Sequence, residues 1–159
     1  MASSYSFKSN SLEETVQLGD KIGQLLRGGE VIELISDLGG GKTALVRGIA
    51  RGIGSNDQVM SPTFTISRIY RGKNLELHHF DFYRLEDPGI MADELSETIS
   101  EQNISVVIEW ADVVKGVLPD DRLSIEISAT AENSRDIAIK SLGEYHDRLV
   151  KELSKELER

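Results

Sequence analysis

Apolar residues follow two different spacings along this chain, and each spacing predicts a different kind of element. Residues 31–35 and 106–108 are short, mostly apolar runs, which are typical of strands buried on both faces of a sheet. Residues 64–70 and 75–81 alternate apolar and polar positions on either side of a turn at 71–74, which predicts an antiparallel hairpin. Shorter alternating segments predict three further strands, at 5–7, 122–128 and 135–141.

Helical spacing is found in four other segments. The first begins after Ser11, which we expect to cap the helix in a capping box with Glu14, and glycines 28–29 are expected to end it. Further helices are predicted directly after residue 43, over 91–100 and over 144–159. Because helices and strands alternate for much of the chain, the pattern favours an α/β protein that contains one antiparallel hairpin.

The stretch between the first buried strand and the second helix has the residues of a phosphate-binding loop. It is Ser-Asp-Leu-Gly-Gly-Gly-Lys-Thr at 36–43, and strand, glycine-rich turn, Gly-Lys-Thr and helix follow one another in the order that such a loop requires. Glycines let successive backbone N–H groups converge on one point, and the helix N-terminus adds partial positive charge. Lys42 is expected to reach the β- and γ-phosphates, and the Thr43 hydroxyl is expected to bind Mg²⁺.

One position departs from the usual loop, because Ser36 stands where the first glycine is expected. The alternative interpretation is a glycine-rich turn that binds nothing, and the flanking strand and helix disfavour it.

Two carboxylates follow predicted strands and are candidates for a magnesium-nucleotide site. Glu109 ends the buried run at 106–108, and Asp81 ends the strand at 75–81. Since Mg²⁺ prefers oxygen ligands and keeps several waters, we assign Glu109 to the metal, directly or through water, and Asp81 to the attacking water or the outer metal shell. The reverse assignment stays open, and each residue is alternatively a solvated carboxylate at a strand end.

Three other features have a functional and a purely structural interpretation. Ser61-Pro62-Thr63 is either a switch that senses the γ-phosphate or, as composition favours, a turn and strand cap. His78 and His79 are adjacent in a strand and point to opposite faces, so packing or surface roles are favoured over chelation of one ion. Trp110 follows the proposed metal ligand, although a lone tryptophan most often lies in a core.

Length and composition limit the classes of function. The 159 residues are most simply one domain over 1–159, with a formal charge of −9 and no cysteine. The charge argues against a protein that grips nucleic acid by itself, and the missing cysteines exclude disulfides and thiolate chemistry. No signal segment or membrane-spanning run is found, so a cytoplasmic location is expected.

Four motifs taken together resemble the TsaE family, formerly called YjeE, of bacterial P-loop ATPases needed to form threonylcarbamoyladenosine (t6A) on tRNA. They are Asp-Leu-Gly-Gly-Gly-Lys-Thr at 37–43, Ser-Pro-Thr-Phe at 61–64, His-Phe-Asp-Phe-Tyr-Arg-Leu at 79–85 and Glu-Trp at 109–110. The loop alone is generic, whereas His-x-Asp-x-Tyr-Arg followed by Glu-Trp at this spacing is specific. The resemblance runs from about residue 14 to about residue 127.

This resemblance implies a P-loop NTPase fold, a three-layer sandwich in which helices flank a mixed, largely parallel sheet. It implies that Mg²⁺ is held by Thr43 and Glu109, and that Asp81, Lys42 and Glu109 serve hydrolysis. ATP or ADP would contact the loop, Thr63 and Trp110, the loop residues being Leu38, Gly39, Gly40, Gly41, Lys42, Thr43 and Ala44.

The resemblance also implies partners. Family members act on a TsaB–TsaD heterodimer, in which TsaD modifies adenosine 37 of ANN-decoding tRNAs, so this chain would meet tRNA only indirectly. ATP hydrolysis would then be a reset step, slow in the isolated chain and accelerated by the partners. The departure at Ser36 bears on loop geometry, and no role is transferred to residues 91–100.

Other functions remain open on the sequence. A small-molecule kinase shares the loop and the size but usually carries an arginine-bearing lid, and the arginines here are scattered. A GTPase is disfavoured because no Asn-Lys-x-Asp motif occurs. The non-enzymatic alternative is a regulatory module that binds nucleotide and docks on a partner without turnover.

Overall fold

The computed structural model describes residues 3–36, 41–59, 66–83, 85–87 and 89–158. Within these ranges the helical segments are α1 (Leu12–Leu25), α2 (Lys42–Gly52), α3 (Gly89–Ile99), α4 (Glu144–Leu157) and a 3₁₀ helix, η1 (Ala111–Val117). The strands are β1 (Ser4–Ser9), β2 (Val31–Ile35), β3 (Ser67–Arg71), β4 (Glu76–Asp81), β5 (Ile104–Glu109), β6 (Leu123–Ala129) and β7 (Arg135–Ser141).

All seven strands join one sheet in the order β1-β7-β6-β2-β5-β4-β3. The four central strands, from β6 to β4, run parallel, while β3 at one edge and β7 and β1 at the other pair antiparallel. The predicted hairpin is the β3–β4 pair, and the predicted edge strand is β1. The predicted mixed sheet is therefore confirmed, with its parallel part in the centre.

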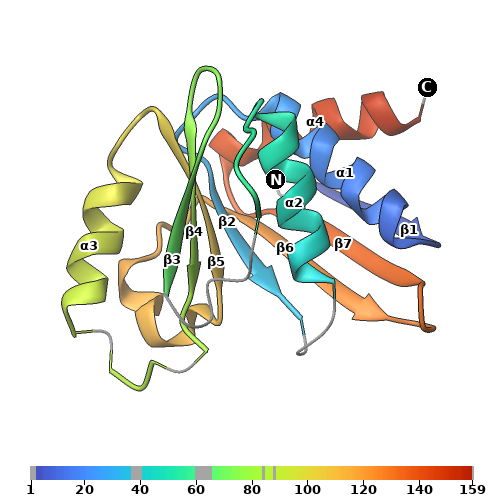
Figure 1. The fold of residues 1–159 in the computed structure, drawn as a ribbon. Coiled ribbons are helices and arrows are strands. Elements are labelled where there is room, and N and C mark those ends of the chain that lie inside the picture. Colours follow the sequence, from blue (N-terminus) through green and yellow to red (C-terminus); the bar gives the residue numbers. More distant parts are fainter. Residues whose placement is uncertain (1–2, 37–40, 60–65, 84, 88, 159) are drawn as a thin grey trace.

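Helices cover the sheet on both faces, which makes three layers (Figure 1). One apolar cluster joins α1, α2 and α4 to one face, and it includes Leu18, Leu45, Leu149 and Val107. A second cluster joins α3 and η1 to the other face, and Val106 and Ile108 of β5 belong to it. Alternate residues of β5 thus enter different cores, which explains why this strand is apolar without interruption.

The first helix starts as its sequence predicts, with one difference. The Ser11 hydroxyl accepts a hydrogen bond from the backbone N–H of Glu14 at 3.1 Å. The Glu14 carboxylate reaches back to the N–H of Asn10, one residue before the position that a standard capping box uses. The helix ends at Leu25, three residues before the glycines that were expected to end it.

Four glycines bring α1 and α2 into direct backbone contact. A Cβ on Gly19 or Gly23 of α1 would lie 2.3 Å from a carbonyl oxygen of α2. A Cβ on Gly48 would lie 2.0 Å from the Val16 oxygen, and one on Gly52 would lie 2.3 Å from the Asp20 oxygen. Only hydrogen fits between the two helices at these places, so the position of α2 is set by the backbone of α1.

Polar contacts fix α4 at the end of the sheet where the parallel strands begin, opposite their carboxyl ends. Asp121 accepts hydrogen bonds from the N–H of Tyr145 (2.7 Å) and the His146 ring (2.7 Å), so it caps a helix that has no side-chain cap of its own. The fully buried Glu30 pairs with Arg148 at 3.1 Å. None of the helices in the described ranges has both the length and the apolar character needed to cross a bilayer.

Candidate nucleotide-binding site

The predicted site residues meet at the carboxyl edge of the parallel strands. β5 lies between β2 and β4, and Glu109 at its end pairs in register with Leu34 of β2 and with Asp81 of β4. The helix α2 follows β2 and begins with Lys42. The carboxyl end of a parallel sheet is where open α/β folds bind their ligands. The structure therefore brings Lys42, Asp81 and Glu109 to one place.

The start of α2 has the geometry expected of an anion-binding helix terminus. Gly41 has a φ of 100°, in the left-handed region that glycine adopts at little cost. Among the described residues, the N-cap position Gly41 makes no side-chain capping hydrogen bond. Thr43 is half-buried and Ala44 is buried. A phosphate placed here would meet backbone donors and the positive end of the helix dipole.

Lys42 is buried and turns toward the strand ends. Its Nζ lies 3.4 Å from Oε1 of Glu109, and it donates a hydrogen bond to the backbone oxygen of Ser36 at 3.4 Å. It also lies 5.0 Å from the centre of the Trp110 ring, within the range of a cation–π interaction. The lysine predicted for the phosphates thus pairs with the carboxylate predicted for the metal.

Glu109 receives its second partner from the neighbouring strand. Its Oε2 is hydrogen-bonded to Nε2 of His79, which is 1% exposed. Burial alone would raise the pKa of Glu109, but the His79 hydrogen bond and the adjacent Lys42 outweigh it and lower that pKa. Glu109 is therefore ionised at neutral pH, which is the state that a metal ligand needs.

Asp81 is held by the backbone on both sides of it. Its Oδ1 accepts a hydrogen bond from the N–H of Tyr83 at 3.0 Å, and its own N–H donates to the oxygen of Ile66 at 2.8 Å. The side chain is only 5% exposed. A buried carboxylate fixed in this way is suited to orienting a small polar molecule such as water.

Two non-glycine residues of the described ranges have positive φ, and both adjoin these carboxylates. Ile66 has a φ of 67° and Trp110 a φ of 57°. Such conformations cost about 1 kcal/mol or more, and they cluster at functional sites. The bend at Trp110 brings its ring to Lys42 on one side and to the Tyr83 ring, 5.0 Å away, on the other.

Known proteins resemble this chain over most of its length. The profile of the family described as "Threonylcarbamoyl adenosine biosynthesis protein TsaE" matches residues 9–137. A protein of that name from Bacillus subtilis is 36% identical over 143 residues, covering 90% of this chain and 89% of the relative. One from Treponema pallidum is 34% identical over 131 residues, covering 82% and 96%. The chain belongs to the TsaE family.

A solved structure also resembles this chain. The crystal structure of YdiB from Bacillus subtilis superposes with a TM-score of 0.83 at 31% identity, covering 98% of this chain and 97% of that one. The chain therefore has the P-loop NTPase fold of the TsaE family, as its sequence predicted. The family match also extends beyond the stretch of about 14–127 in which the motifs indicated it.

The side chains of Glu109 and Thr43 in this TsaE protein suit Mg²⁺ better than they suit a metal ion that needs all its ligands from the protein. In the described part of the chain, no group of three or more His, Cys, Asp or Glu is arranged to hold an ion. Glu109 offers an ionised carboxylate beside Lys42, and Thr43 offers a hydroxyl in the next position of α2. One carboxylate and one hydroxyl fit Mg²⁺, which takes its other oxygens from phosphates and water.

Two residues near the site were missed by sequence reasoning. His79 was assigned to packing or the surface, whereas it is the hydrogen-bond partner of Glu109, and His78 on the opposite side pairs with Glu76. Arg135, at the start of β7, has its Nε 3.4 Å from where a Cβ on Gly41 would lie. His79 reaches Glu109 because β4 and β5 are neighbouring strands, and Arg135 reaches Gly41 from the start of β7. Both relationships depend on the strand order, which the sequence alone does not reveal.

Some predicted contacts fall outside the described residues. These are Leu38, Gly39 and Gly40 of the loop and Thr63 of the Ser-Pro-Thr segment. Their roles stay predictions, as do the roles of the residues whose positions are described above.

Proposed function

We propose that this chain is a magnesium-dependent ATPase that serves t6A formation at adenosine 37 of ANN-decoding tRNAs by acting on a TsaB–TsaD heterodimer. The observation that supports this most directly is the contact of Lys42 with Glu109 at the carboxyl edge of the sheet. In this contact the cation proposed for the phosphates lies next to the anion proposed for the metal, and the cation is the first residue of α2.

Binding of ATP or ADP exchanges the partners of Lys42. The phosphates would lie at the start of α2, against the backbone of residues 38–44. Lys42 would move from Glu109 to the β-phosphate oxygens and, when the nucleotide is ATP, to the γ-phosphate oxygens. Glu109 and Thr43 are then available for Mg²⁺. When bound, Mg²⁺ offsets negative charge on the phosphate oxygens.

In this proposal Asp81 orients the attacking water. Its carboxylate is fixed by the Tyr83 N–H and lies beside Glu109 across the β4–β5 pair. A water hydrogen-bonded to Asp81 attacks the γ-phosphorus, the bond from that phosphorus to the β–γ bridging oxygen breaks, and ADP leaves. The water proton passes to the products, inorganic phosphate and ADP.

Hydrolysis by the isolated chain is expected to be slow. The arginine beside Gly41, Arg135, donates through Nη1 to the backbone oxygens of Ala131, Glu132 and Ser134 in its own turn. Because these hydrogen bonds engage Arg135, it is not assigned as an arginine that stabilises the transferred phosphoryl group. In this proposal the partners accelerate the reaction, either by supplying such a group or by ordering the segment at 61–63. With a net charge of −9, this chain leaves contact with tRNA to those partners.

Phosphate release from Mg-ATP tests this proposal. It is measured for the chain alone and with the matched TsaB–TsaD pair, with Lys42→Ala as the control. We expect a low basal rate that rises with the pair and collapses in the variant. A rate indifferent to the pair contradicts partner stimulation and favours phosphoryl transfer to a small hydroxyl acceptor.

Asp81→Ala distinguishes an ATPase from a regulatory module that only binds nucleotide. If t6A formation survives in the reconstituted system while hydrolysis is lost, turnover is not required and the regulatory interpretation is correct. If both are lost while nucleotide and partner binding persist, hydrolysis is required.

A further inference from the structure

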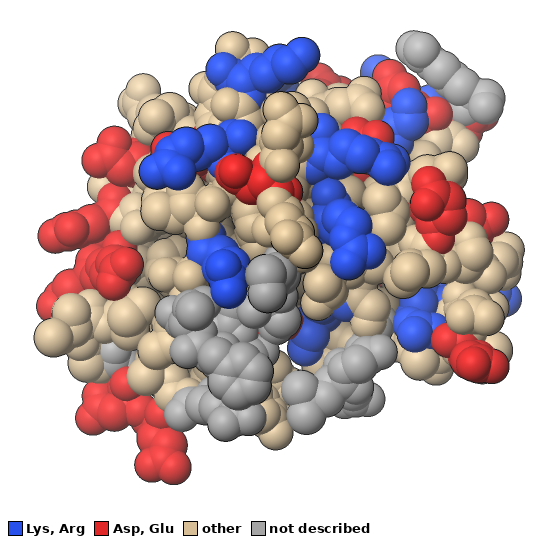
Figure 2. Space-filling model, viewed as in Figure 1, with Lys and Arg blue, Asp and Glu red and all other residues tan. Residues whose placement is uncertain are grey.

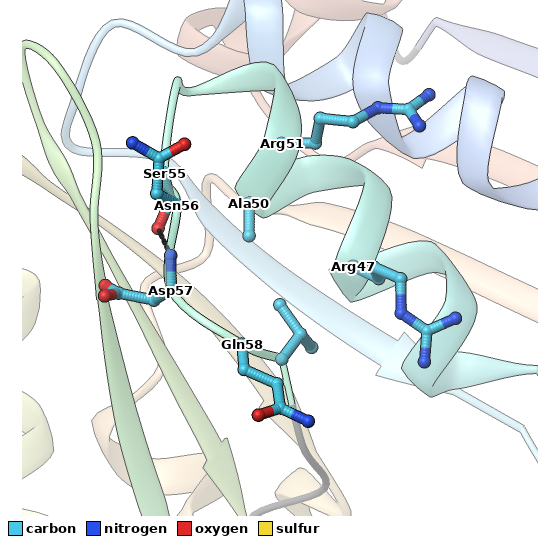
Figure 3. A pocket seen from close by; sticks show the side chains of 8 residues that line it. Arg47, Ala50, Arg51, Ser55, Asn56, Asp57 and Gln58 are labelled. Atoms are coloured by element: carbon cyan, nitrogen blue, oxygen red, sulfur yellow. Dashed lines mark hydrogen bonds between the residues drawn. The ribbon is translucent and has the colours of Figure 1, made fainter.

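A groove of about 450 Å³ lies on the outer side of α2, away from the contact of Lys42 with Glu109. One wall is the helix, from which Arg47 and Arg51 project, and the other is the loop at 55–59 (Figure 3). Ser55, Asn56 and Gln58 line that loop with hydroxyl and amide groups, and buried Ala50 lies on the helix side. In Figure 3 the guanidinium ends of Arg47 and Arg51 point away from this loop, so they flank the groove, which is lined by uncharged hydrogen-bonding groups and by the carboxylate of Asp57.

The groove is the centre of a basic area on an acidic protein. Figure 2 shows Lys and Arg side chains gathered over α2 and the β3–β4 hairpin, while Asp and Glu gather over α3. Arg47 is exposed and makes no ion pair or hydrogen bond within the described ranges. Arg51 is half exposed and pairs with Asp20 at 3.1 Å. Lys73 of the hairpin adds a third cation beside Gly54. Arg47, which is exposed and has no ion-pair partner within the described ranges, is therefore suited to binding an anionic partner.

Hydrogen bonds tie the loop wall of the groove to α2 and to β3. The N–H of Ser55 donates to the Ala50 oxygen of α2 at 3.0 Å. On the hairpin side, Asp57 accepts from the N–H of Arg71 at 2.8 Å. α2 begins at Lys42, and β3 pairs with β4, which ends at Asp81. A ligand in the groove therefore touches a loop that is bonded to α2 directly and linked to β4 through β3. The loop also leads directly into residues 60–65.

We propose that this groove docks an acidic segment of the protein partner, with Asp or Glu carboxylates of that segment on Arg47 and Arg51. The inference rests on the partner pair of the proposed function and adds the surface by which this chain is held. Arginine is suited to the role because its guanidinium binds carboxylates through two parallel hydrogen bonds.

Charge distinguishes an acidic protein segment from RNA as the occupant. Nucleic-acid binding gains affinity from neutralising many phosphates, about six to ten in strong binders. The groove offers two arginines and the nearby Lys73, and Asp57 places a carboxylate on its wall. A short acidic segment with a few carboxylates fits this set, whereas a continuous phosphate backbone would meet Asp57.

The test is the affinity of the full chain for the matched TsaB–TsaD pair, measured by biolayer interferometry, with basal phosphate release measured in parallel. We expect Arg47→Glu to weaken binding by about tenfold or more, because it reverses the charge that faces the partner. Basal phosphate release stays within about twofold of wild type, because Arg47 lies outside the catalytic site. Gln58→Glu, which adds a negative charge from the opposite wall without altering α2, weakens binding in the same direction.

A matched control separates local from overall charge. Lys140→Glu makes the same change of charge on the exposed side of β7, away from the groove, and is expected to leave the affinity unchanged. Unchanged affinity in both Arg47→Glu and Gln58→Glu overturns the inference. The inference is also overturned if these variants bind the TsaB–TsaD pair normally but the resulting complex binds tRNA more weakly. In that case RNA would be the occupant of the groove. If wild type itself does not bind the pair, the partner assignment of the proposed function fails, and this inference with it.

Discussion

The Nζ of Lys42 and Oε1 of Glu109 lie 3.4 Å apart in a setting where both side chains are more than nine-tenths buried. Each group therefore satisfies the other's charge before nucleotide arrives, because an unpaired buried charge would be costly. In the proposed mechanism, nucleotide replaces this contact on the Lys42 side and the metal replaces it on the Glu109 side. The two halves of the site are thus linked through one ion pair.

The fluorescence of Trp110 is expected to report the movement of Lys42 away from Glu109 when nucleotide binds. Trp110 is the single tryptophan of the chain, and its ring lies 5.0 Å from Nζ of Lys42. When Mg-ADP draws the cation away from the ring, we expect the emission of Trp110 to change. In Lys42→Met, titrated to saturation, the change should be much smaller. An equal change in the variant would mean that Lys42 stays where it is.

Replacing Glu109 by Gln is expected to have opposite effects with and without the metal. In EDTA, ADP binds more tightly than to wild type, by up to about tenfold, because no ion pair breaks and a negative charge near the phosphates is gone. With Mg²⁺, ADP binds more weakly than to wild type, because a ligand is lost. Calorimetry in EDTA and in Mg²⁺ measures the change in ADP affinity under each condition. Equal weakening of ADP binding in both would contradict the proposed exchange of the partners of Lys42.

His79 is expected to act as a positioning residue through Glu109. In His79→Ala, the Mg²⁺ concentration that half-maximally strengthens ADP binding should rise about tenfold, as expected when the partner of a metal ligand is removed. His79→Gln, which keeps a side-chain N–H donor, should recover part of this. His78→Ala is the matched control on the opposite side of the strand. A purely structural role would lower the melting temperature of His79→Ala and leave the Mg²⁺ dependence intact.

Asp121 should make stability depend on pH in the acid range. Slight burial raises the pKa of this carboxyl, but hydrogen bonds from His146 and Tyr145 lower it below its ordinary value of 3.8. Because the folded-state pKa is depressed, Asp121 stabilises the fold above about pH 3.8 and loses this effect as the pH falls through the folded-state value. Asp121→Asn is therefore expected to be less stable than wild type at neutral pH. Urea unfolding across the pH range should show the two converging below about pH 4, and a constant difference would contradict the ionic origin.

Gly48→Ala tests the contact between α1 and α2. Alanine favours helices over glycine by about 1 kcal/mol, so propensity alone predicts stabilisation. The new Cβ would instead lie 2.0 Å from the Val16 oxygen, and we expect a loss of about 2 kcal/mol in the free energy of unfolding. Gly116→Ala, where nothing lies within 4 Å of the new Cβ, should change it by less than about 0.5 kcal/mol. Comparable effects of the two variants would show that the helices are not in backbone contact.

Much of this fold is readable from the sequence because it is encoded locally. The apolar runs of β2 and β5, the hairpin β3–β4 and the cap at Ser11 all depend on residues within a few positions of one another. The loop composition likewise identifies Lys42 and Thr43. What is local in the chain could be predicted, including most of the residues that gather at the site.

The remainder depends on which elements become neighbours. The strands follow one another as β2, β4 and β5, but β5 lies between the other two, and only this order sets His79 against Glu109. Asp121 lies more than twenty residues before the helix that it caps, so no local pattern in the sequence links the two. From the sequence alone, the glycines inside α1 and α2 predict weak helices. In the structure they allow the backbones of the two helices to touch.

The glycine contact has a mechanical meaning. Side chains between two helices can rotate and repack, so helices separated by them can slide by small amounts. Two backbones in contact have no such adjustable parts, and their separation is set by atomic radii. The helix that begins with Lys42 is therefore held at a fixed distance from the N-terminal helix, independent of rotamer changes elsewhere. A displacement of the Lys42 end of α2 would therefore be expected to carry α1 with it.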